Sequence, residues 1–164
     1  MSLKTLLLLL LCPLLLLSGC AAPRPSATEV LTALCQSQTA LPAGRIYVLS
    51  AREDDAAHPS DTLLSALFGN GERPIALDGV EDAAFFLSYA SAFELAVFYC
   101  STADGTKDVA EMCLHRLDTL KLYRTDDASV AMLEQARVSV HGTVVVLLLC
   151  TDPNAALRAL RRTL

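Results

Sequence analysis

The sequence lacks the short motifs that mark common catalytic, nucleotide-binding and metal-binding sites. It contains no C-x-x-C pair, which argues against a zinc knuckle and against a thioredoxin-like redox site. It contains no H-E-x-x-H, no G-x-S-x-G and no glycine-rich phosphate loop. Histidine is scarce, and the three present (His58, His115 and His141) lie far apart in the sequence. We therefore predict no catalytic site, no cofactor and no metal, and expect the protein not to be an enzyme.

A run of apolar residues long enough to span a membrane is also missing. The run at residues 6–17 has twelve residues, all leucine except Cys12 and Pro13. At about 1.5 Å per helical residue it would cover about 18 Å, against roughly 30 Å of hydrocarbon in a bilayer. One cation, Lys4, precedes the run, and small residues follow it. This order is typical of a secretory signal peptide.

The end of this segment resembles a bacterial lipobox. Residues 17–20 read LSGC, and the resemblance implies cleavage after Gly19 and a diacylglycerol thioether on the sulfur of Cys20. The other interpretation is an ordinary signal peptide that ends near a cysteine. Two acyl chains anchor a protein stably. We therefore predict a signal peptide at residues 1–19, a lipidated Cys20 with a short spacer at 20–27, and a cell-membrane protein facing outward.

The predicted mature chain is acidic and of single-domain size. Removal of residues 1–19 leaves 145 residues and takes away one of the 13 basic residues, so 12 basic residues face 18 acidic ones and the net charge is −6. This charge argues against a nucleic-acid partner. It also provides no broad attraction to anionic lipid.

Four cysteines remain if Cys12 leaves with the signal peptide and Cys20 carries lipid. An exported chain allows one or two disulfides among them, and the best pair is Cys100 with Cys113, across a short loop. The alternative is buried free thiols, because each cysteine lies in an apolar run. The four are Cys35, Cys100, Cys113 and Cys150.

Hydrophobic periodicity predicts one α+β domain over residues 28–164. We expect a mainly antiparallel sheet of four to five strands with helices packed on it. Residues 143–150 are apolar on both faces, which indicates a central, covered strand. Thr28 is expected to cap the first helix, and residues 70–71 and 103–105 to form turns. Gly69 is expected to end a helix at the C′ position, and Val130 and Leu133 to point inward. The strand pairs 83–88 with 93–100, and 137–140 with 143–150, are expected to form hairpins. The predicted strands are residues 45–50, 83–88, 93–100, 137–140 and 143–150, and the predicted helices start near residues 28, 60, 107, 127 and 155.

Several residues in the second half of the chain carry a family resemblance. They are residues 93–98 (FELAVF), Arg116, Tyr123, residues 133–138 (LEQARV), and Gly142 with the apolar strand that ends at Asp152. Their spacing resembles the small Gram-positive lipoproteins grouped as domain of unknown function 4358. The resemblance covers roughly residue 28 to the end and is strongest after Phe93. It departs from the family at residues 99–100, where a more polar residue is usual. It implies an extracytoplasmic lipoprotein of a Firmicutes-like cell and carries over no site residue.

Two groups of charged side chains suggest contacts. Glu94 interrupts an apolar strand, and Arg116 falls on the apolar stripe of its helix, so we predict a partly buried ion pair between them; the alternative is that both reach the solvent at an edge. Glu111, His115 and Asp118 share the opposite helix face and could ligate a metal, although a solvated face explains them better. The acidic pairs at residues 54–55 and 126–127 are interpreted as caps and solvated loops.

These observations favour a membrane-tethered binding or structural module of the cell envelope. Its expected partners are the membrane, through Cys20, and an envelope protein or a ligand. A small exported enzyme and a small-ligand sensor are the alternatives. A polar cleft with shifted pKa values would favour the enzyme, and an exposed apolar patch or an unpaired sheet edge would favour the partner interpretation.

Overall fold

The computed structural model describes residues 24–69, 77 and 79–164. The predicted signal peptide, the lipobox with Cys20 and residues 21–23 of the spacer lie outside these described residues. The turn expected at residues 70–71 lies outside them as well. The predicted domain at 28–164 is otherwise covered, apart from the short gaps at residues 70–76 and 78.

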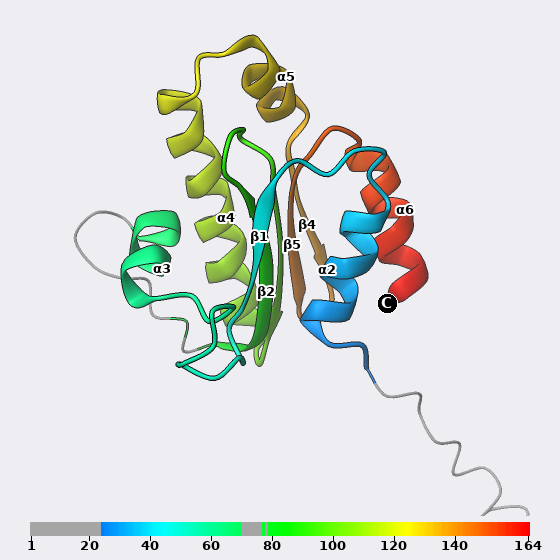
Figure 1. Ribbon diagram of the computed structural model, residues 1–164. Helices are drawn as coiled ribbons and strands as arrows, with labels where there is room; N and C mark the ends of the chain where they lie inside the picture. The colour runs from blue at the N-terminus through cyan, green and yellow to red at the C-terminus, as the bar shows by residue number, and fades with distance from the viewer. Residues whose placement is uncertain (1–23, 70–76, 78) are drawn as a thin grey trace, which may run out of the picture.

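Five antiparallel strands form a single sheet, as the sequence predicts. In chain order they are β1 (Gly44–Val48), β2 (Val80–Ser88), β3 (Glu94–Cys100), β4 (Arg137–His141) and β5 (Val144–Leu149). Their order in the sheet is β1-β2-β3-β5-β4, and each neighbouring pair is antiparallel. The two predicted hairpins, β2–β3 and β4–β5, are confirmed. The α+β fold class is therefore confirmed (Figure 1).

Two of the three inner strands, β3 and β5, are buried along their whole length. Every residue of both strands is buried, which confirms the central strand predicted from residues 143–150. Successive side chains of a strand point to opposite faces of the sheet. Because both faces of these strands are apolar, the sheet needs a layer of helices on each side.

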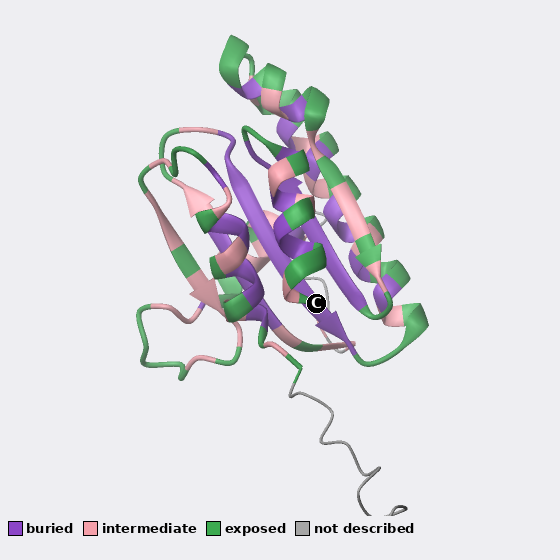
Figure 2. Ribbon diagram, turned by 90° about the vertical axis from the view of Figure 1, so that its right-hand side faces the viewer, coloured by how far each residue is buried: buried purple, intermediate pink, exposed green. Residues whose placement is uncertain are grey.

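Helices cover the sheet on both sides, which gives three layers (Figure 1). Helices α2 (Ala27–Gln36) and α6 (Pro153–Thr163) pack against one face, where Leu95 and Val97 belong to the same buried cluster. Figure 2 views this side and shows buried strands beneath helices whose outward residues are exposed.

The other face carries α3 (Asp61–Phe68), α4 (Ala103–Tyr123) and α5 (Asp127–Gln135). Phe68 of α3 meets Phe85 and Phe98 of the sheet edge-on, at ring-centroid distances of 5.8 and 5.5 Å. Such geometry adds to the stabilisation from burying the rings. Leu133 of α5 is buried as predicted, but Val130 is 39% exposed, so its predicted inward position is wrong.

Three local predictions are wrong for reasons of capping. Ser26, not Thr28, caps α2: its hydroxyl accepts from the Glu29 N–H, and the Glu29 carboxylate accepts from the Ser26 N–H. The turn expected at residues 103–105 is the first turn of α4, because the Thr102 hydroxyl accepts from the Gly105 N–H and starts the helix there. Gly69 ends α3 with an extended backbone, φ −73°, and not in the left-handed conformation expected of a glycine at that position.

The sheet has two distinct ends. At one end β2 begins, β3 ends and β5 begins, because Val80 pairs with Cys100 and Val144 pairs with Tyr99. The short turn at Gly142 (φ 59°) joins β4 to β5 there. Here Arg24 lies 3.5 Å above the Tyr99 ring and 3.5 Å from the Glu81 carboxylate. At the other end, Leu87 pairs with Glu94, and Glu94 with Leu149. We call these the Arg24 end and the Glu94 end.

Replacing Ser26 tests the observed start of the first helix. Ser26→Ala removes the hydroxyl that accepts from the Glu29 N–H, and we expect the free energy of unfolding to fall by about 1 kcal/mol. Thr28→Ala is the matched control and should change it by less than about 0.5 kcal/mol. Urea denaturation measures both variants. A larger loss for Thr28→Ala than for Ser26→Ala would contradict the assignment of the cap.

Candidate functional site

The predicted ion pair between Glu94 and Arg116 is confirmed. Glu94 begins β3 with the same strand parity as Ala96 and Phe98, so its side chain faces α4. Arg116, in the middle of α4, donates from Nε at 3.1 Å and from Nη2 at 3.0 Å to the same oxygen, Oε2. The side chain of Glu94 is only 3% exposed, and that of Arg116 is 14% exposed. The pair therefore ties α4 to the Glu94 end of the sheet.

The second carboxylate oxygen of Glu94 is left without a partner. Oε1 is buried and accepts no hydrogen bond from the described residues. Burial raises the pKa of the Glu94 carboxyl above its usual value, and the opposing attraction of Arg116 is the weaker influence. A buried carboxyl with one satisfied oxygen is costly for stability. This pair thus differs from a fully paired salt bridge, because it leaves one buried acceptor without a donor.

A cavity of about 130 Å³ opens beside this pair. Besides Glu94 and Arg116, it is lined by one further arginine, Arg124, just after α4. Arg124 is half-buried and forms no ion pair or side-chain hydrogen bond with any residue in the described part of the chain. The polar lining is Ser88, Ser91, Glu94, Arg116 and Arg124, and the apolar lining is Leu67, Leu87, Ala92, Phe93 and Leu120.

The β2–β3 turn fixes the two serines of this lining. The Ser91 hydroxyl donates to the Ser88 hydroxyl at 2.9 Å, and the backbone N–H of Ala90 donates to the same Ser88 oxygen at 3.2 Å. Sequence reasoning identified Glu94 and Arg116 but missed Ser88, Ser91 and Arg124. Nothing in the sequence distinguishes Arg124 from the exposed arginines, because the turn and the end of α4 meet only in the folded chain.

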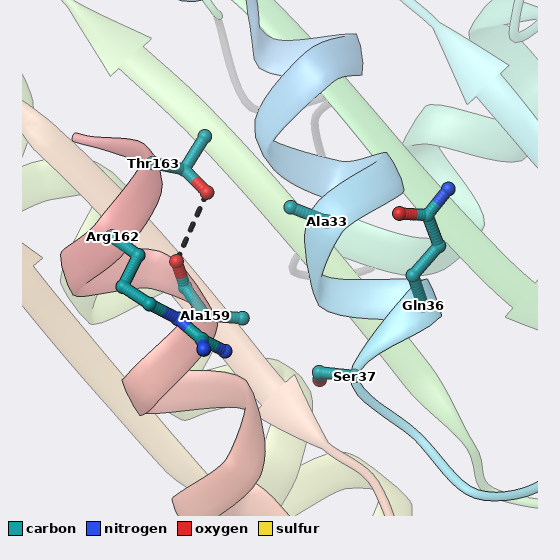
Figure 3. A pocket seen from close by; sticks show the side chains of 6 residues that line it. All are labelled: Ala33, Gln36, Ser37, Ala159, Arg162 and Thr163. Carbon is teal, nitrogen blue, oxygen red and sulfur yellow. Dashed lines mark hydrogen bonds between the residues drawn. The ribbon is translucent and has the colours of Figure 1, made fainter.

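A larger hollow of about 240 Å³ lies between α2 and α6 (Figure 3). Its lining contains one charged residue, Arg162, and its Thr163 hydroxyl already donates to the Ala159 carbonyl at 3.0 Å. Figure 3 shows Gln36 pointing away from α6. None of the buried side-chain atoms that lack a hydrogen bond belongs to a residue of this hollow. The cavity at the Glu94 end is therefore the better candidate site.

The disulfide predicted between Cys100 and Cys113 is not formed in the structure. All four described cysteines are buried free thiols, which was the alternative interpretation. Burial raises the pKa of Cys35 to about 11 and that of Cys150 to about 12, and it raises the pKa of Cys113 further. Because the thiolate is the reactive form, these thiols are poor nucleophiles in the folded protein.

The remaining charged candidates have simple structural partners. Glu111 pairs with Lys107 at 4.0 Å and Asp118 with Lys121 at 2.8 Å, as expected of a solvated helix face. Asp126 caps α5 through the Ser129 N–H. Within the described ranges there is no group of three His, Cys, Asp or Glu residues placed to hold a metal ion.

Comparison with models of known protein families, with curated proteins and with solved structures found no match. The resemblance to domain of unknown function 4358 therefore stays a prediction from the residues quoted above. In the described part of the chain, no helix combines the length and the apolar character needed to cross a membrane.

The raised pKa of Glu94 predicts a pH dependence that Glu94→Gln removes. The unfolded carboxyl ionises near its usual pKa of 4.5, whereas the folded one keeps its proton to higher pH. The folded state then holds more protons, so the wild-type free energy of unfolding should fall relative to Glu94→Gln as pH rises above 4.5. Denaturant unfolding between about pH 4 and 8 measures the difference. Glu111→Gln is the exposed control on α4. A wild-type free energy of unfolding that rises relative to Glu94→Gln with increasing pH would mean that Arg116 dominates.

Thiol counting tests the state of the cysteines. After denaturation without reductant, Cys35, Cys100, Cys113 and Cys150 of the processed chain should all react with a thiol reagent, and reductant should expose no more. In Cys100→Ser the count should fall by one. If a disulfide joined Cys100 to Cys113, the same substitution would instead release a thiol and raise the count obtained without reductant.

Proposed function

We propose that the chain is a lipoprotein of the outer face of the cell membrane that acts as an extracytoplasmic binding module. The leucine run, the small residues before Cys20 and the cysteine itself support a diacylglycerol anchor on Cys20. The thiol provides the nucleophilic sulfur that lipid transfer requires. Two acyl chains hold a protein on a membrane without a spanning helix.

Contacts of Arg24 support a short tether. Arg24 rests on the Tyr99 ring and faces Glu81, so the chain joins the folded domain four residues after Cys20. Four residues span at most about 14 Å when extended. The Arg24 end of the sheet therefore stays close to the bilayer in a lipidated protein.

The observation that carries the proposed binding role is the cavity at the opposite end. Glu94 and Cys100 are the first and last residues of β3, six residue steps apart, and at about 3.3 Å per step they are about 20 Å apart. The cavity with Glu94, Arg116 and Arg124 thus faces away from the membrane, where ligands or envelope proteins reach it.

Cys20→Ala tests the anchor. The wild-type chain should fractionate with membranes, and mass spectrometry should find an N-terminal Cys20 that carries diacylglycerol. Cys20→Ala should lose the lipid, because no other side chain in residues 17–20 offers a sulfur. Cys12→Ala is the matched control and should be processed normally. A Cys20→Ala protein that is still cleaved after Gly19 and acylated would contradict the proposal.

A further inference from the structure

The residues that line the Glu94 cavity carry unequal numbers of acidic and basic groups. They include one acidic residue, Glu94, and two arginines, Arg116 and Arg124. Arg116 is compensated by Glu94, whereas Arg124 forms no ion pair with the described residues and acts on its nearest acidic neighbour, Asp126, only at longer range. Arginine stays charged at any pH at which proteins are folded. The lining therefore carries one positive charge in excess, which favours a singly charged anion.

The donors for such an anion are in place. A guanidinium has five N–H donors, and Arg116 uses only two of its nitrogens, Nε and Nη2, on Glu94. Arg124 uses none of its side-chain donors on the described residues. Its backbone is nevertheless fixed, since its N–H donates to the Leu120 carbonyl at 2.9 Å. The planar, forked guanidinium group of an arginine matches the two oxygens of a carboxylate, and this cavity is lined by two arginines.

Size and lining restrict the rest of the ligand. The cavity has a volume of about 130 Å³. Because water occupies about 30 Å³ per molecule in the liquid, a ligand group as large as about four water molecules fits. Leu67, Leu87 and Leu120 contribute apolar lining beside the arginines. Bound inorganic phosphate or sulfate would place polar oxygens against these apolar side chains. A carboxylate with a short hydrocarbon chain matches both the arginines and the apolar lining.

We propose that this cavity is a binding site for small organic monocarboxylates, with the carboxylate on Arg124 and Arg116 and the hydrocarbon chain against Leu67 and Leu120. Glu94 is a positioning residue: it holds Arg116, and in its ionised form it keeps the net charge of the lining at one. The proposal rests on the binding role proposed above and names its ligand class. It does not depend on the anchor, because the cavity lies at the Glu94 end of the sheet.

Calorimetric titration of the full-length chain in non-ionic detergent tests the ligand class. The probes are acetate, butyrate, hexanoate, inorganic phosphate and n-butylamine. Butyrate should bind with one-to-one stoichiometry and more tightly than acetate, while phosphate and n-butylamine should not bind. Tight phosphate binding, n-butylamine binding, or no binding by any carboxylate would overturn the proposal.

Two variants locate the site. Arg124→Gln keeps the backbone bond to Leu120 and should weaken butyrate binding at least tenfold, because a charge-assisted pair is lost. Arg158→Gln, an exposed arginine on α6, is the matched control and should bind as the wild type does. Leu67→Ala enlarges the apolar side and should shift the preference from butyrate towards hexanoate. Binding that Arg124→Gln leaves unchanged would overturn the proposed site.

These outcomes are separate from those of the anchor test. The titration uses purified protein and reports on the Glu94 cavity whether or not Cys20 carries lipid. A lipidated wild type that binds no carboxylate would refute the ligand class and leave the anchor standing. A protein that binds butyrate but has no lipid on Cys20 would refute the anchor and leave the binding site standing.

Discussion

Burial of β3 and β5 on both faces is the constraint on which the rest of the structure depends. Every side chain of these strands is covered, so each face needs its own helices, α2 with α6 on one side and α3, α4 and α5 on the other. Apolar surface buried on two faces contributes most of the favourable free energy of folding. It also makes any charge within these strands expensive. Glu94 carries the only charge in these two fully described strands, and the placement of Arg116 on α4 follows from it.

The Glu94–Arg116 pair is poorly explained by stability alone. Apolar replacements of a buried ion pair are often neutral or stabilising, because two charges must leave water for one attraction. The free-energy cost of burying this pair is higher still, because Oε1 of Glu94 has no donor. Burial also has a larger effect than Arg116 on the pKa of the Glu94 carboxyl. The pair also borders a cavity that holds a second arginine without an acidic partner. A site that recruits an anion accounts for the second arginine, because the anion supplies the negative charge that the lining of the cavity lacks.

Sequence patterns predicted the parts of the fold that depend on one element at a time. The apolar runs at residues 83–88, 93–100 and 143–150 identified the strands, and the 100° helical repeat placed Arg116 toward Glu94. The start of α4 was missed, because the stretch at residues 103–105 is as typical of a turn as of a helix capped by Thr102. Whether Cys100 and Cys113 are joined could not be decided, since buried thiols and a short-loop disulfide leave the same pattern. Arg124, Ser88 and Ser91 meet only through tertiary packing.

The antiparallel topology separates the two proposed roles of the molecule. β2 leaves the Arg24 end and β3 returns to it, so the turn between them, with Ser88 and Ser91, lies a full strand length from the point where the chain enters the domain. Helix α4 runs back along the sheet and places Arg124 beside that turn. A tether fixed by Arg24 leaves little freedom for the domain to turn its other end toward the lipid. With an anchor on Cys20, the same hairpin that builds the core would therefore also present the cavity to the extracytoplasmic side.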